Sequence, residues 1–318
     1  MVSRPVGETR DGVELTSLDG PLTDDQAVTK RQLVDYLDAV RDRILPVLTG
    51  RALSVVRVRP GQPAFMQKNL PKYAPEWINT ASVWAEASHR QVAYPLCDDR
   101  RTLLWLANQR AVEYHPTLML HGSRHPSHLV LDLDPPADGA FQAVVATARL
   151  VERALAEAGL AGALKTSGSK GLHIFVPLVD GVEPEDAAAA TRALGARAAA
   201  LDPTFATTAY IKQDREGKVF MDSTRSGGAT VVAAYSPRVR AGFPVSYPLA
   251  WTEVDGVVPA DFTVVNALER LGDADPWREL MPAPQTLPAD LVQEGHAIPV
   301  ARVAAMHEGK RRARARRE

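Results

Sequence analysis

The chain has 318 residues, of which 45% are hydrophobic and 24% charged. Its formal net charge of −1 excludes a uniformly basic surface, so any site for a polyanion must be a local basic patch. Its single cysteine, Cys97, excludes an internal disulfide and favours a reducing compartment. Because residues 1–12 do not form an apolar segment and no apolar run reaches the roughly 20 residues that span a bilayer, we expect a cytoplasmic protein with no membrane partner.

The first part of the chain predicts a mixture of helices and strands. Residues 1–28 predict an extended arm with a short strand at 13–18. Apolar residues at helical spacing predict a helix over 29–44 that ends at Pro46. The next predicted elements are a strand over 51–59, a long connection over 60–80, a hairpin over 83–96 and a helix over 101–113.

The second part opens with an apolar strand over 128–134 and the clearest helix of the chain, 141–159. The other predicted elements are a Gly-rich turn over 165–171, a strand over 172–178, an Ala-rich helix over 184–201, a strand or hairpin over 210–222, a turn at 226–228 and a strand over 229–235. Strands and helices do not alternate regularly. We therefore expect an α+β fold, with mostly antiparallel sheets flanked by helices, rather than a doubly wound sheet.

Two carboxylates end the strand at 128–134. Side chains alternate along a strand, so Asp132 and Asp134 lie on one side while Leu131 and Leu133 pack on the other. Two carboxylates on one face repel each other unless a cation lies between them, and Mg²⁺ and Mn²⁺ prefer such oxygen ligands. The alternative is that both aspartates cap the Asp-Pro turn. The strand alone leaves both interpretations open.

Two further features could belong to the same site. Asp222 ends another apolar strand, and a site with two metal ions needs about three carboxylates. Residues 167–173 contain most of the Gly-rich turn and the start of the next strand, and the backbone N–H groups of the turn could bind a phosphate, although it lacks the spacing of the usual P-loop. Either feature could equally be an ordinary turn, and Arg225 and Arg238 nearby could be solvated edge charges.

Aromatic and basic residues occur together in the long connection. Phe65 and Met66 precede Lys68, an arrangement that could stack a base above a phosphate contact. The alternative is a small satellite core. The basic run at 310–318 predicts a solvated tail with weak non-specific affinity for nucleic acid.

The order of these motifs is more specific than any one of them. The strand ending Asp-Leu-Asp-Pro, then Thr-Ser-Gly-Ser-Lys-Gly-Leu-His, Gly-Lys-Val-Phe-Met-Asp and Ala-Tyr-Ser-Pro-Arg, resembles the polymerase domain of bacterial ATP-dependent DNA ligase D. That family belongs to the archaeo-eukaryotic primase superfamily. The resemblance runs from Leu15 to Trp251 and implies an arm (1–28), a primase-polymerase catalytic domain (29–271) and a C-terminal extension with a basic tail (272–318).

The resemblance implies a role for each matching residue. It assigns two Mn²⁺ or Mg²⁺ ions to Asp132, Asp134 and Asp222, the triphosphate to Ser167, Lys170, His173 and Arg238, and the nucleotide sugar to His115. Further nucleotide contacts would come from Phe65, Met66, Lys68 and Arg225, and DNA contacts from Lys30 and from Arg57 or Arg59. The implied activity is a nucleotidyltransferase of DNA break or gap repair that extends primer 3′ ends or fills short gaps, with ribonucleotides preferred to deoxyribonucleotides.

The chain also departs from the family pattern. Met66 replaces the second aromatic residue, and Gly20 follows Asp19 where end-joining members have a lysine that helps to hold a 5′-phosphate. We expect a stand-alone, nucleoid-associated homologue that works on DNA with NTPs or dNTPs, with a Ku-type end-binding protein and a separate ligase as candidate partners. The rival functions are a two-metal phosphoesterase or nuclease and a non-catalytic DNA-repair binding module on the same fold.

Overall fold

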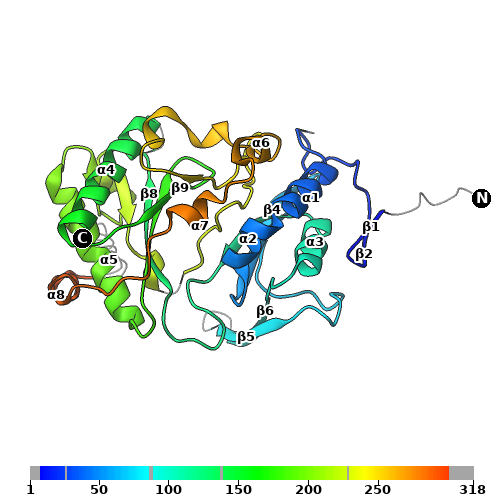
Figure 1. Ribbon diagram of the computed structural model, residues 1–318, viewed down its shortest axis with the longest axis horizontal. Helices are drawn as coiled ribbons and strands as arrows, with labels where there is room; N and C mark the ends of the chain where they lie inside the picture. Colours follow the sequence, from blue (N-terminus) through cyan, green and yellow to red (C-terminus); the bar gives the residue numbers. More distant parts are fainter. Residues whose placement is uncertain (1–7, 26, 86–88, 137–138, 228, 301–318) are drawn as a thin grey trace, which may run out of the picture.

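The computed structural model describes residues 8–25, 27–85, 89–136, 139–227 and 229–300, which form two lobes (Figure 1). The first lobe contains β1 (Glu8–Arg10), β2 (Val13–Leu15), α1 (Lys30–Ala39), α2 (Arg41–Leu48), β3 (Leu53–Arg59), β4 (Gln62–Gln67), β5 (Thr80–Ala85), β6 (Arg90–Pro95), α3 (Arg100–Asn108) and β7 (Ala111–Pro116). Its largest sheet has the order β4-β3-β7 and is antiparallel, while β1-β2 and β5-β6 form separate hairpins.

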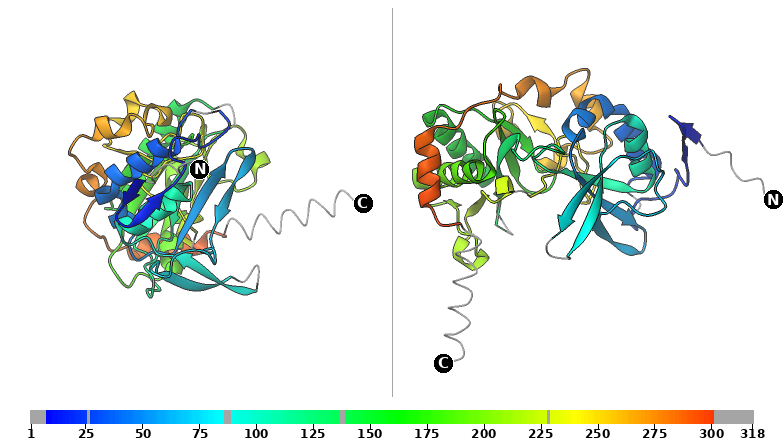
Figure 2. Two further views of the ribbon diagram at one scale, coloured as in Figure 1. Left: turned by 90° about the vertical axis from the view of Figure 1, so that its right-hand side faces the viewer. Right: turned by 90° about the horizontal axis from the view of Figure 1, so that it is seen from below.

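The second lobe contains the larger sheet. Its elements are β8 (His128–Asp134), α4 (Phe141–Glu157), β9 (Ala163–Thr166), β10 (Leu172–Pro177), α5 (Pro184–Leu201), β11 (Ala206–Thr207), β12 (Val219–Asp222), β13 (Pro248–Leu249), α6 (Ala267–Leu271), α7 (Pro276–Leu280) and α8 (Ala289–Ala297). The strand order is β11-β12-β8-β10-β9-β13, with only β11 and β12 parallel. Helices α4 and α5 pack on this sheet, and α8 packs on α5 (Figures 1 and 2). The expected α+β fold with mostly antiparallel sheets is confirmed.

A single hydrophobic cluster extends through both lobes. Buried hydrogen bonds also join them, because the hydroxyl of Tyr36 on α1 donates to the carbonyl of Tyr235 at 2.8 Å. Trp277 and Leu291 are buried in the same cluster, so the described part of the expected C-terminal extension packs on the rest of the chain. The expected basic tail at 310–318 lies outside the described residues.

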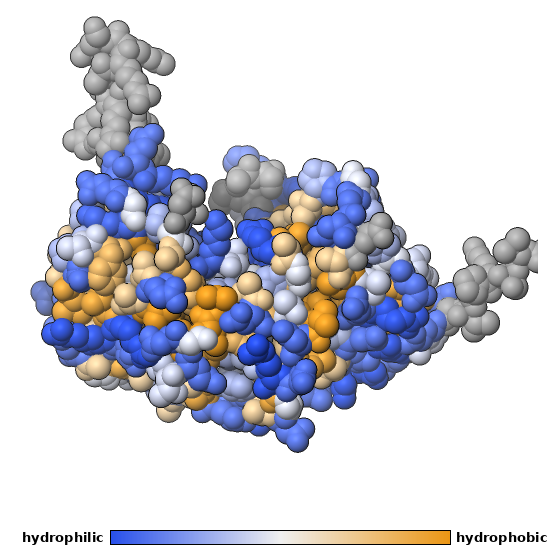
Figure 3. All heavy atoms as spheres, turned by 90° about the horizontal axis from the view of Figure 1, so that it is seen from above, coloured by the Kyte–Doolittle hydropathy of each residue, from blue (hydrophilic) through white to orange (hydrophobic). Residues whose placement is uncertain are grey.

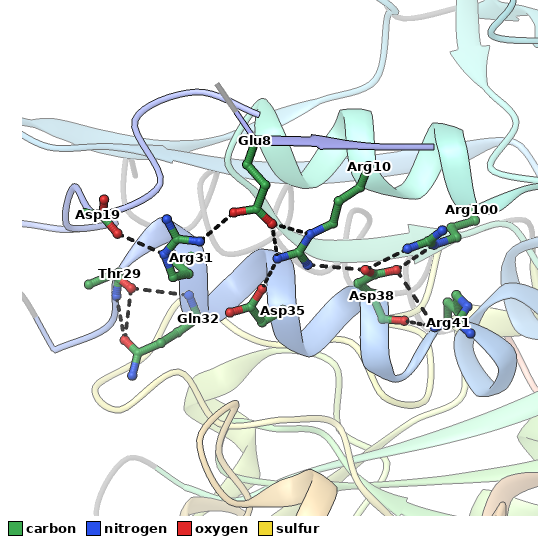
Figure 4. Close-up of polar contacts among 10 residues, drawn as sticks. All are labelled: Glu8, Arg10, Asp19, Thr29, Arg31, Gln32, Asp35, Asp38, Arg41 and Arg100. Carbon is green, nitrogen blue, oxygen red and sulfur yellow. Dashed lines mark hydrogen bonds and ion pairs between the residues drawn. The ribbon is translucent and has the colours of Figure 1, made fainter. Parts of the chain in front are cut away.

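Ion pairs fasten the N-terminal arm to α1 (Figure 4). Arg10 lies 2.6 Å from Asp35 and 3.2 Å from Asp38, and Arg31 lies 2.7 Å from Glu8. Arg100 on α3 reaches Asp38 at 2.7 Å. The described part of the arm is therefore anchored to the first lobe by charge as well as by the buried Val13 and Leu15.

Three predicted elements of the first lobe differ from the structure. The helix over 29–44 divides at Val40, and Pro46 lies inside α2, which continues to Leu48 and lacks one backbone hydrogen bond at the proline. The connection over 60–80 contains β4, since Pro60-Gly61 forms a tight turn with Gly61 at φ +72°. The helix over 101–113 ends at Asn108, so Glu113 lies on β7.

Two predicted strands of the second lobe also differ. Within 210–222 only the last four residues form a strand, preceded by a 3₁₀ helix at Lys212–Arg215. In the described part of 229–235 the backbone follows β7 through single bonds, such as Val231 N to Pro116 O at 3.2 Å, without becoming a continuous strand. Gly228 of the expected 226–228 turn lies outside the described residues.

None of the helices that the structure describes is long and apolar enough to cross a membrane. On the face shown in Figure 3, hydrophilic residues dominate the outer parts and hydrophobic residues gather in patches across the middle.

Candidate active site

A polar row crosses the larger sheet of the second lobe. Asp222 on β12 pairs in register with Asp132 on β8, Asp132 with His173 on β10, and His173 with Lys165 on β9. Residues directly opposite one another on neighbouring strands point to the same face of a sheet. The sheet therefore places four chemically active side chains side by side, although their positions span 91 residues from Asp132 to Asp222.

The carboxylates of this row are held by a single arginine. Arg225 lies 3.0 Å from Asp132 Oδ2 and 3.4 Å from Asp222 Oδ2, and so bridges the two. Burial opposes ionisation of Asp132, but His173 and Arg225 outweigh it and hold the pKa of this carboxyl below its usual range. Asp134 lies at the open end of β8, where partial burial and the neighbouring Asp132 raise its pKa to about 6. Negative charge is thus crowded at this strand end.

A buried lysine orients His173. Lys165 Nζ lies 2.8 Å from His173 Nδ1 and donates to Ser246 Oγ at 2.6 Å. Because Nδ1 accepts from the lysine, the proton of the neutral ring belongs on Nε2, which lies 3.2 Å from Asp132 Oδ1. Burial, with the Lys165 charge, lowers the pKa of His173 to about 4. His173 therefore acts here as a fixed N–H donor to Asp132.

The Gly-rich turn over 167–171 closes one side of the site. Ser167 Oγ accepts hydrogen bonds from the backbone N–H groups of Ser169 at 3.2 Å and Gly171 at 3.0 Å. Gly168 has φ +64°, and a Cβ there would lie 2.6 Å from Arg238 Cγ, so the turn needs glycine to pack against that arginine. Arg238 in turn donates to the carbonyl of Ser167.

Glu113 on β7 joins two predicted nucleotide contacts. Its Oε2 lies 2.8 Å from His115 Nε2 and 3.1 Å from Arg238 Nε, and its Oε1 accepts from Val239 N at 2.8 Å. Burial opposes ionisation, but these partners outweigh it and lower the pKa of Glu113 to about 2. Glu113 was not predicted as a site residue, because it falls at the end of the helix expected over 101–113.

These features surround a pocket of about 650 Å³. Predicted residues that line it are His115, Asp132, Asp134, Ser167, Lys170, His173, Arg225 and Arg238. Asp222 is not among the lining residues but lies 3.4 Å from Arg225, which is one of them. Four basic residues without a predicted role in the site also line it: Lys212, Arg215, Lys218 and Arg240. Basic side chains outnumber the acidic ones, as a polyphosphate site requires.

The remaining predicted residues lie away from this pocket. On β4, Phe65 and Met66 are 38% and 48% exposed, and Lys68 follows them on the surface with Arg59 nearby on β3. Arg59 and Arg57 lie 5.9 and 5.7 Å from the Phe65 ring centroid. The exposed strand thus presents both an apolar and a basic surface.

Two predicted DNA contacts are turned into the protein instead. Lys30 is buried and donates to the carbonyl of Thr16 at 2.5 Å, and burial lowers its pKa to about 8. Arg57 is buried and donates to Gln109 O and Gln67 Oε1, both at 2.7 Å. In this conformation neither side chain is available to a phosphate.

The order of these strands and turns matches a known family. The family model described as "LigD, primase-polymerase domain" matches residues 29–277. The chain belongs to this family. A solved structure, the polymerase domain of Mycobacterium tuberculosis ligase D in complex with DNA, is similar with a TM-score of 0.77 and 31% identity, covering 85% of this chain and 97% of that chain.

Curated relatives of the primase-polymerase family are longer proteins. The bifunctional non-homologous end joining protein LigD of Bacillus subtilis is 32% identical over 264 residues, which cover 81% of this chain and 42% of the relative. The multifunctional non-homologous end joining DNA repair protein LigD of M. tuberculosis (strain H37Rv) is 36% identical over 274 residues, which cover 81% of this chain and 35% of the relative. The chain thus spans less than half the length of either relative.

The donors of this site suit divalent cations. Asp132, Asp134 and Asp222 offer carboxylate oxygens, the ligands that Mg²⁺ and Mn²⁺ prefer. In the described part of the chain no three acidic, histidine or cysteine side chains are already grouped to hold a metal, and Arg225 bridges two of the three carboxylates. Burial and the neighbouring Asp132 raise the pKa of Asp134, and a bound cation would favour the ionised form of this carboxyl. The donor set fits once Arg225 withdraws.

Proposed function

We propose that this chain is a DNA-dependent nucleotidyltransferase that extends primer 3′ ends, or fills short gaps, in DNA break or gap repair. The observation that carries this proposal is the row of Asp222, Asp132 and His173, in which Asp132 and His173 line a basic pocket beside the Gly-rich turn. A hydrolase of a plain phosphodiester has less need of that turn and of Arg238.

Different residues of the pocket would bind the phosphates and the sugar of a nucleoside triphosphate. Ser167, Lys170 and Arg238 would bind the phosphates, where fixed positive charge stabilises both the charge already present and the charge that develops during transfer. His115 would lie beside the sugar, which is the basis of the proposed preference for NTPs over dNTPs. His173 would hold Asp132 in place through its Nε2–H.

Asp132, Asp134 and Asp222 would hold two Mn²⁺ or Mg²⁺ ions. When bound, such ions would lower the pKa of the attacking 3′-hydroxyl and neutralise charge on the phosphates. Arg225 would exchange its carboxylate partners for phosphate oxygens when those ions bind. Asp132 and Asp222 lie in register on adjacent, hydrogen-bonded strands, which would keep their two carboxylates in fixed positions beside each other.

The exposed β4 strand is the proposed DNA surface. Phe65 and Met66 would stack on bases, and Lys68 and Arg59 would contact phosphates. A Ku-type end-binding protein and a separate ligase remain the proposed partners, by analogy with the end-joining relatives, and nucleoid association would follow from DNA binding.

Glu113→Gln is expected to raise the Kd for a nucleoside triphosphate about tenfold, equivalent to about 1.4 kcal/mol. The substitution keeps an acceptor for Val239 N but weakens the charged contacts that hold Arg238 and His115 in place, so the triphosphate loses two pre-positioned partners. Fluorescence titration with a labelled triphosphate measures the effect, and Glu152→Gln on α4, whose partner is Arg149, is the matched control. An unchanged Kd for Glu113→Gln would show that the carboxylate does not position these residues.

Primer extension on gapped and overhanging duplexes tests the proposed activity. Wild-type protein should extend the primer with Mn²⁺ or Mg²⁺, use NTPs more efficiently than dNTPs, and stop when EDTA removes the metal. Absence of extension with both metals and both sugars would refute the polymerase proposal. Binding of DNA without extension would favour the non-catalytic module.

A further inference from the structure

A second cavity, of about 360 Å³, lies at the junction of the two lobes. We call it the junction cavity. It is lined by residues of α2, α7, β8 and β10, and Figure 1 shows α2 and α7 next to each other at this junction. Val231 and Val232 line both this cavity and the pocket of about 650 Å³ described above, which we call the nucleotide pocket. This short segment is therefore a wall that the two share.

The walls of the junction cavity are mostly apolar. Val47, Phe175, Trp277 and Met281 contribute to them, and the Phe175 and Trp277 rings meet edge to face with centroids 5.1 Å apart. The volume falls at the lower end of the range of small-molecule sites. A flat apolar body fits such walls better than a polar one, because it buries apolar surface without leaving polar groups unpaired.

The charge that the described lining residues give the junction cavity is positive. Among its described lining residues Arg51 and Arg278 are basic and none is acidic. Arg51 donates to Thr117 O at 3.1 Å and to Ser127 Oγ at 2.8 Å, both neutral acceptors. Among the described residues Arg51 has no ion pair with a carboxylate, and burial lowers the pKa of its guanidinium. Arg51 is partly buried, and a partly buried cation without a counter-charge is unfavourable, so an anion that enters the cavity gains a strong partner.

The other polar groups of the cavity do not neutralise Arg51. The His128 ring shares a hydrogen bond with Ser127 Oγ at 2.8 Å, and burial, with the nearby Arg51 charge, lowers the pKa of His128 to about 3, which keeps the ring neutral. Arg278 is largely exposed and approaches Asp275 only to 3.9 Å, so it adds positive charge at the rim.

We propose that the junction cavity binds a small amphipathic anion, with its flat apolar body against Phe175 and Trp277 and its carboxylate or sulfonate group on Arg51. Because the ligand would press on the Val231–Val232 wall, its binding would also change the affinity of the nucleotide pocket on the other side. This second consequence rests on the proposed function, whereas ligand binding itself does not.

Fluorescence titration with 8-anilinonaphthalene-1-sulfonate tests the site, with the uncharged N-phenyl-1-naphthylamine as the matched probe. We expect one saturable sulfonate site per chain, and Arg51→Gln should weaken it about tenfold or more while leaving the uncharged probe within about twofold. Val47→Phe, which fills the cavity from a half-buried position on α2, should weaken both probes. The control Arg153→Gln, on the exposed face of α4, should change neither.

Equal binding of the sulfonate by wild type and Arg51→Gln would refute the anion site, and unchanged binding by Val47→Phe would place the probe elsewhere. Thermal melting confirms that each variant is folded. For the shared wall, a saturating sulfonate probe should change the Kd for a nucleoside triphosphate by about threefold or more, and the nucleotide should change the probe Kd by the same factor. No reciprocal change would refute the coupling. Failure to bind nucleotide at all would contradict the proposed function and leave the probe result standing.

Discussion

Replacing Asp132 or Asp222 by alanine is expected to slow nucleotide addition by at least about a hundredfold. The two carboxylates lie opposite each other on β8 and β12 and share Arg225, so either substitution removes an oxygen donor from the proposed cation site. Single-turnover extension of a primer on gapped DNA at saturating Mn²⁺ measures the loss without contributions from product release.

A matched control separates this effect from a general loss of negative charge. Asp42 lies on α2 with its side chain 82% exposed, and Asp42→Ala should extend primers at the wild-type rate. Near-wild-type extension by Asp132→Ala would contradict the assignment of the carboxylates. Circular dichroism of each variant shows whether the lost rate reflects the site or unfolding.

Gly171→Ala is expected to destabilise the protein by about 3 kcal/mol and to reduce extension with it. A Cβ at Gly171 would lie 2.0 Å from the carbonyl oxygen of Leu133 on β8, a backbone atom that cannot move aside alone. Either β8 or the Gly-rich turn must shift, and both carry site residues. Equilibrium unfolding in urea gives the change in free energy, and single-turnover extension gives the change in rate.

Gly256→Ala is the control for this prediction. A Cβ at Gly256 would meet nothing within 4 Å, and its φ is not in the left-handed region. The free energy of unfolding should change by less than about 0.5 kcal/mol. If Gly171→Ala were equally harmless, the close packing of the turn on β8 would not limit its sequence.

The sequence predicted the long, regular elements well. The helix over 184–201 has the same bounds in α5, and the helix over 141–159 begins at the same residue as α4. In such long segments the apolar residues repeat over several helical turns, so the pattern distinguishes a helix from a strand, which a short apolar run does not. By contrast, β4 was missed because both of its faces are exposed and it shows no alternation of apolar and polar residues. The sequence signal for β4 was the Pro60-Gly61 turn that precedes it.

For the site, the motifs could be predicted from the sequence, but the contacts between them could not. The row from Asp222 to Lys165 depends on the register of neighbouring strands, which the sequence does not specify pair by pair. Glu113 forms an ion pair with Arg238, which lies 125 positions later in the chain, and no local sequence pattern predicts this contact. The burial of Lys30 likewise depends on the arm that covers it, and a basic residue gives no local sign of such burial.

The stoichiometry of the products tests the account most directly. Wild-type protein, given a gapped duplex, Mn²⁺ and a single nucleoside triphosphate, should lengthen the primer by whole nucleotides and release one pyrophosphate for each nucleotide added. Mass spectrometry of the primer and a coupled pyrophosphate assay measure the two quantities together. Shortened primers with free mononucleotides and no pyrophosphate would contradict nucleotidyl transfer and assign the aspartate row to hydrolysis.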